Sequence, residues 1–187
     1  GERAESLAPP GVALGGHSFG GKVALEAVKG LEEVRQVWVL DSTPAPIEEG
    51  TSAEGVLRLL KGVDTPMESR KAVVQLLKDR GLDDMTAQWV ATNLKSSPKG
   101  VDWGLDLDAL GGMLKDFYKA DLWDVIESPP HDVVFHILKA SKSNILKPAD
   151  LERAQFASAA SLHEIESGHW VNVGNPKALL ETMLTYL

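Results

Sequence analysis

The 187-residue chain has an ordinary globular composition, with 43% hydrophobic and 25% charged residues. Its net charge of −8 argues against nucleic acid or an anionic membrane as its main partner. It contains no cysteine, which excludes disulfides, thiol nucleophiles and thiolate metal sites. No apolar run approaches the roughly 20 residues of a membrane span. We therefore expect a single soluble, intracellular domain over residues 1–187.

The first part of the chain predicts a strand–helix–strand unit. A short apolar segment, Val12–Leu14, has the character of a strand buried on both faces. A glycine-rich turn follows, then a helical pattern that Gly30 ends. A second buried strand covers Val37–Leu40. Connections this short predict a right-handed crossover between parallel strands.

Residues 47–128 differ from what precedes them, because they contain no convincing strand. They predict four helices, over residues 54–60, 67–80, 83–94 and 105–123. A loop of this length would be improbable, so we expect a helical cap inserted into the sheet. The sheet core is then expected in residues 1–46 and 129–187.

The last part of the chain returns to strands. Val133–Leu138 predicts a third buried strand, and Ser161–Ile165 a fourth after a helix near residues 148–157. Gly168–Trp170 predicts a loop, and Pro176–Leu187 a closing helix with proline near its start. The fold expected is α/β, a parallel sheet flanked by helices.

Ser18 stands at the centre of Gly16-His17-Ser18-Phe19-Gly20, between a predicted strand and a predicted helix. This is the context of a nucleophile elbow, Gly-x-Ser-x-Gly. Gly16 and Gly20 would carry no side chain to clash in so tight a turn. The N–H of Phe19, at the helix N-terminus, would stabilise an oxyanion. The alternative is a glycine-rich turn without chemistry.

A serine hydroxyl needs a general base, usually a histidine. The candidates are His17, His131, His136, His163 and His169. Side chains diverge at a tight turn, which disfavours His17, and His136 and His163 fall within predicted strands. His131 precedes a strand, at the wrong edge of the sheet. His169 follows the last strand, at the carboxyl edge where sites in parallel sheets gather, and is the predicted base.

The predicted third member is Asp41, which would orient the imidazole. It follows the strand after the nucleophile helix, whereas the loop 139–144 offers no carboxylate. Its alternative role is to cap the next segment. The order Ser18, Asp41, His169 is that of an α/β-hydrolase.

The chain resembles the α/β-hydrolase superfamily, and within it the abhydrolase domain-containing protein 11 type with its bacterial and plant plastid relatives. Four segments carry the resemblance: Gly16–Lys22, Val39–Pro44, Ser141–Asn144 and Gly168–Val171. It places the triad acid on Asp41. It implies hydrolysis of small carboxylic esters or thioesters through an acyl-enzyme, with no metal and no organic cofactor. An organellar location, in a plastid or mitochondrion, is a further implication.

Hydrolases of this group carry about four strands and a His-Gly loop before the nucleophile, whereas only 17 residues precede Ser18 here. That loop supplies the second oxyanion donor. The chain is then part of a longer protein, is completed by another polypeptide, or is a non-catalytic accessory or structural subunit. A ligand-binding module without turnover is a further alternative. An open edge at Val12–Leu14 predicts a protein partner or self-association.

Overall fold

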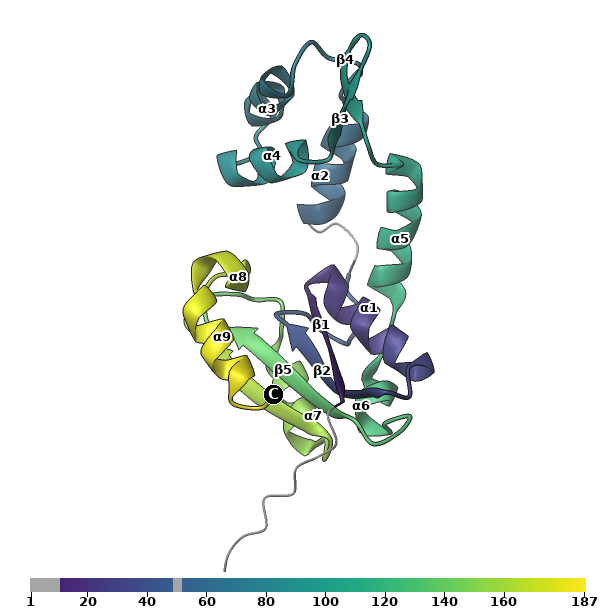
Figure 1. Ribbon diagram of the computed structural model, residues 1–187, viewed down its shortest axis with the longest axis vertical. Coiled ribbons are helices and arrows are strands. Elements are labelled where there is room, and N and C mark those ends of the chain that lie inside the picture. The colour runs from purple at the N-terminus through teal and green to yellow at the C-terminus, as the bar shows by residue number, and fades with distance from the viewer. Residues whose placement is uncertain (1–10, 49–51) are drawn as a thin grey trace, which may run out of the picture. The chain divides into compact units, whose positions relative to one another are not determined.

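The computed structural model describes residues 11–48 and 52–187 (Figure 1). The chain divides into two compact units, Gly1–Pro46 with Ala120–Leu187, and Ile47–Lys119. The first unit holds the parallel sheet, and the second is inserted in sequence between its two halves. The inserted unit is shorter than the expected 47–128, because it ends at Lys119.

The sheet has four strands in the order β1-β2-β5-β6, and every neighbouring pair is parallel. The strands are β1 (Val12–His17), β2 (Val34–Leu40), β5 (Val134–Ala140) and β6 (Ala160–Ile165). The expected α/β fold is confirmed. His17 pairs with Leu40, and Leu40 pairs with Leu138. The carboxyl ends of β1, β2 and β5 therefore lie side by side.

Helices cover both faces of this sheet. One face packs against α1 (Phe19–Ala27), α6 (Trp123–Glu127) and α7 (Pro148–Phe156) through a core that includes Val37, Val39, Phe135 and Ile137. The other face contributes Leu138 and Ala140 to a smaller cluster with α8 (Val171–Gly174) and α9 (Pro176–Leu184). Figure 1 shows α1 and α9 on opposite sides of the strands. Burial on both faces explains why β2 and β5 read as continuous apolar runs.

Strand β1 forms one edge of the sheet, since among the described strands it pairs with β2 alone. Val12 at its start is 53% exposed. The prediction that Val12–Leu14 is buried on both faces is wrong, because Val12 and Ala13 are exposed and Leu14 is half-buried at this edge of the sheet.

The unit Ile47–Lys119 has its own core. Its helices are α2 (Ser52–Lys61), α3 (Arg70–Asp79), α4 (Asp84–Ala91) and α5 (Leu107–Lys119). Ser69 and Asp83 accept hydrogen bonds from the backbone N–H groups of Ala72 and Thr86, which fixes where α3 and α4 begin. The buried residues Val73, Leu77 and Ala87 join these helices.

The expectation that residues 47–128 contain no strand is wrong. Strands β3 (Leu94–Ser97) and β4 (Gly100–Trp103) form an antiparallel hairpin. Gly100 turns the chain at φ +130°, where a side chain would collide with the Met67 carbonyl. The polar β3 lacks the alternation of apolar and polar residues that marks a strand, so the apolar pattern did not predict it.

The predicted helix 105–123 is two helices, because the chain breaks between Lys119 and Trp123. Residues 120–128, expected in the insertion, belong to the unit of the sheet. The reason is packing: Trp123 and Ile126 are buried in the core of the sheet.

Candidate active site

Ser18 occupies the sharp turn between β1 and α1. Its backbone has φ 54° and ψ −117°, a conformation that costs a non-glycine residue about 1–3 kcal/mol and clusters at active sites. Its N–H donates to the Leu40 carbonyl at 3.0 Å, which ties the turn to the end of β2. Although Ser18 is the N-cap residue of the described helix α1, its hydroxyl makes no capping hydrogen bond. The turn has the strand–turn–helix geometry of a nucleophile elbow.

The glycines around Ser18 are not equivalent. A Cβ on Gly16 would lie less than 3.0 Å from three backbone atoms of Gly20 and Gly21, so this position admits only glycine. A Cβ on Gly21 would lie 2.5 Å from the Ser42 Cβ. A Cβ on Gly20 would meet nothing within 4 Å, so the expected steric need for Gly20 is wrong. The helix approaches Gly16 through the carbonyl of Gly20, and the Gly20 Cα faces open space.

Asp41 directly follows β2 and is fully buried. It has a positive φ of 44°, and its N–H donates to the Leu138 carbonyl at 2.7 Å. Its Oδ1 accepts the N–H of Ala140 at 3.1 Å. These bonds hold the carboxylate at the carboxyl ends of β2 and β5.

His169 lies in the loop between β6 and α8. Its Nδ1–H donates to Asp41 Oδ2 at 2.7 Å, so the two residues that the sequence proposed as base and acid are in contact. With the proton on Nδ1, the Nε2 of His169 carries the lone pair that a general base needs.

The hydrogen bonds around Asp41 decide its charge. Burial on its own would raise the pKa of Asp41, but the hydrogen bonds from His169, Ser143 and Ala140 outweigh it and hold that pKa below its ordinary value. Asp41 is therefore a carboxylate at neutral pH. Ser143 lies in the loop after β5, where the sequence predicted no residue that contacts Asp41.

Ser18 and His169 are brought to the same edge of the sheet, but the described part of the chain shows no hydrogen bond between their side chains. Their link runs through His17. Its Nε2–H donates to the His169 carbonyl at 2.7 Å, and the two rings are 4.6 Å apart. No pattern in the sequence signals this contact, because His17 and His169 are 152 positions apart. Phe19 begins α1, directly after Ser18.

The other histidines lie away from this edge. His131 donates from Nε2 to the Val34 carbonyl, at the amino end of the strands. His136 Nδ1 and His163 Nε2 share a 3.0 Å hydrogen bond on the face of the sheet, and His136 stacks on Trp38.

Acidification from pH 6.5 to about 4 should destabilise the protein through His136. Burial first, then the neighbouring His163, lower the pKa of His136 from 6.5 to about 4. In this window the unfolded chain binds a proton that the folded chain does not. The free energy of unfolding therefore decreases by up to about 3 kcal/mol as the pH is lowered. The contribution of neutral His136 to the free energy of unfolding is fully present above pH 6.5. Denaturant unfolding at pH 7 and 4.5 should show a smaller loss in His136→Phe than in wild type, and equal losses would contradict this.

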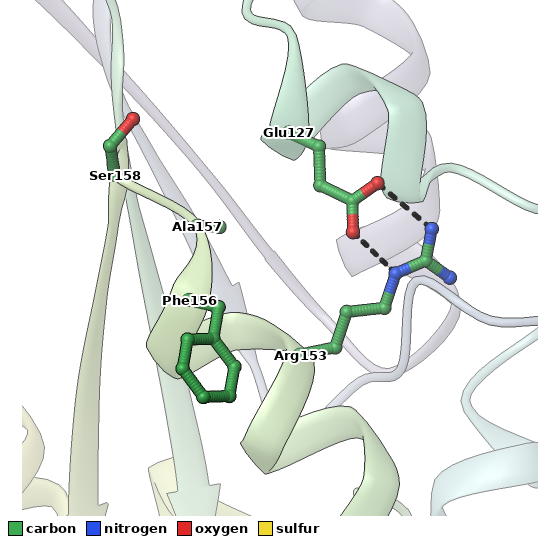
Figure 2. Close-up of a pocket in the computed structure, with 5 residues that line it drawn as sticks. All are labelled: Glu127, Arg153, Phe156, Ala157 and Ser158. Carbon is green, nitrogen blue, oxygen red and sulfur yellow. Dashed lines mark hydrogen bonds and ion pairs between the residues drawn. The ribbon is translucent and has the colours of Figure 1, made fainter.

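A surface pocket of about 310 Å³ lies elsewhere (Figure 2). It is lined by Glu127, Arg153, Phe156, Ala157 and Ser158. Arg153 forms a bidentate ion pair with Glu127 and lies 4.9 Å from the Trp123 ring centroid. Since Ser158 precedes β6, the pocket is at the amino edge of the sheet, opposite to Ser18.

Within residues 11–48 and 52–187, no group of three or more His, Cys, Asp or Glu residues could hold a metal ion. None of the helices in this described part has the length and apolar character to cross a membrane.

A family model described as the alpha/beta hydrolase family matches residues 2–182. A marine microorganism esterase superposes with a TM-score of 0.82 at 22% identity, covering 95% of this chain and 70% of that one. The thioesterase domain from the curacin biosynthetic pathway superposes with a TM-score of 0.62 at 16% identity, covering 96% of this chain and 68% of that one. E-2-(acetamidomethylene)succinate hydrolase superposes with a TM-score of 0.66 at 20% identity, covering 97% of this chain and 68% of that one. No curated protein matches the chain. At these identities the structural likeness shows the fold.

Proposed function

Because the chain belongs to the alpha/beta hydrolase family, we propose that it is a serine hydrolase that cleaves small carboxylic esters or thioesters. Ser18 is the nucleophile, His169 the general base and Asp41 the acid that orients it. The observation that supports this most is the 2.7 Å hydrogen bond between His169 Nδ1 and Asp41 Oδ2, beside the strained turn of Ser18. The esterase and thioesterase among the similar structures favour these substrates.

The reaction proceeds through an acyl-enzyme. As Ser18 Oγ attacks the acyl carbon, His169 Nε2 takes the hydroxyl proton, and the carbonyl electron pair moves onto its oxygen. The N–H of Phe19 donates to this oxyanion. Collapse of the intermediate expels the alcohol or thiol, which receives the proton from His169. Water then repeats the sequence at the acyl carbon, releases the acid and restores Ser18. Asp41 stays ionised and stabilises the imidazolium.

The proposal is tested by covalent labelling with a fluorophosphonate probe. We expect wild type to be labelled and Ser18→Ala to be unlabelled, because the probe bonds to an activated serine oxygen. The matched control is Ser158→Ala, an exposed serine at the opposite edge, which should label as wild type. Labelling that persists in Ser18→Ala would assign the reaction to another residue.

A second candidate function is an accessory subunit that binds another polypeptide along β1. The observation that favours it is the open edge of this strand, with Val12 exposed. Light scattering after size-exclusion chromatography would then report a mass above that of one chain, and the probe would not label the protein. A monomer that labels at Ser18 contradicts this candidate.

The proposal of a serine hydrolase includes membership of the abhydrolase domain-containing protein 11 type within the family.

A further inference from the structure

His17 contacts the main chain of the loop that carries His169. Its Nε2–H donates to the His169 carbonyl at 2.7 Å, across 152 positions of sequence. Its ring centroid lies 4.6 Å from that of His169 and 5.6 Å from that of Trp170. His17 is also the last residue of β1 and the neighbour of Ser18. A rigid strand end therefore holds both the turn of Ser18 and the loop of His169.

Two bonds fix His169 better than one. The bond from Nδ1 to Asp41 anchors the imidazole at a single point, and the N–H of Val171, two residues along the loop, donates to the His169 carbonyl at 2.9 Å. The bond from His17 anchors the backbone of the same residue from the β1 side. The side chain and the main chain of His169 are thus held from two different strands, β2 through Asp41 and β1 through His17.

We propose that His17 is a positioning residue for acyl transfer, whose Nε2–H holds the His169 carbonyl and so aims the His169 imidazole at Ser18. This inference rests on the proposed function. The Nε2 of His17 donates to a carbonyl, so this nitrogen is not available to accept a proton. Its contribution is geometric, and it is made through the main chain of another residue.

The charge state of His17 fits this role. Burial lowers the pKa of His17, the bond to the His169 carbonyl opposes that change, and the nearby His169 adds to it. The charged and titratable groups that act on His17 are His169 and Asp41. The net lowering keeps His17 neutral at neutral pH, with its proton on the donating nitrogen. No second positive charge then opposes protonation of His169 during the reaction.

The test compares His17→Met with His17→Gln. The two side chains have similar length and flexibility, but only glutamine has an N–H that can reach a carbonyl. We expect His17→Met to lower the rate of fluorophosphonate labelling by about 10- to 100-fold, because small misplacements of a catalytic group cost this much. His17→Gln should stay within about threefold of wild type. His163→Met, on the face of the sheet, is the control for loss of a histidine elsewhere.

A second measurement does not depend on activity. The low-field proton resonance of the His169 Nδ1–H should broaden or shift in His17→Met and persist in His17→Gln. Unchanged labelling and an unchanged resonance in His17→Met would overturn the inference while leaving the proposed function intact. Equal losses in both variants would also overturn it, because the donor would not matter. A wild type that fails to label contradicts the proposed function, and the resonance still reports whether His17 holds the loop.

Discussion

Replacing Asp41 with asparagine should lower the rate of fluorophosphonate labelling by about 10⁴-fold, the loss that this change causes in Ser-His-Asp triads. Asparagine keeps the size of the side chain but can donate to His169 Nδ1. The imidazole proton then moves to Nε2, and the base can no longer accept the Ser18 proton. The lost carboxylate also no longer stabilises the imidazolium. Labelling rates at neutral pH measure the effect.

The matched control is Asp150→Asn. Asp150 is also a buried carboxylate, but it accepts the N–H of Lys147 at the start of α7. We expect this variant to lose about 1 kcal/mol of stability and to label at the wild-type rate. Thermal unfolding of both variants separates rate from stability. A folded Asp41→Asn protein that labels as fast as wild type would remove Asp41 from the proposed triad.

Replacing Gly16 with alanine should destabilise the protein by at least about 3 kcal/mol. The added methyl would overlap backbone atoms of Gly20 and Gly21, which cannot move aside as a side chain can. Relief requires that α1 move away from β1, which also displaces Ser18. Denaturant unfolding gives the loss in free energy, and probe labelling should fall with it.

Gly20→Ala is the control for this change, since its methyl meets nothing within 4 Å. It lies in the first turn of α1, where alanine is the better helix former, so we expect stability unchanged or higher by about 0.5 kcal/mol. If the two variants were equally stable, the close approach at Gly16 would not limit the fold.

Local sequence was sufficient where burial or a motif dictates the structure. The apolar runs in β2 and β5 predicted central strands, because a strand covered on both faces has no polar side. The pattern around Ser18 predicted the turn, and the position of Asp41 after β2 predicted its meeting with His169, since parallel strands end at one edge.

It was insufficient where a strand lacks the usual apolar pattern and where a helical segment packs on the core of the sheet. The hairpin of β3 and β4 has a polar first strand, and its second strand also pairs with Met67. The insertion was predicted to extend to residue 128 but ends at Lys119, because Trp123 and Ile126 pack into the core of the sheet. The turn at Pro98–Gly100 is a local signal for the hairpin, whereas the packing of Trp123 against the sheet leaves none.

The sequence by itself determined the fold class and the three residue types proposed for chemistry, because periodicity and chain order specify which side chains reach the carboxyl edge of the sheet. Only the tertiary structure decided which glycine the turn requires and that His17 holds the His169 loop. These features depend on atoms of residues far apart in the chain meeting within a few ångströms, and no pattern of neighbours encodes such a distance.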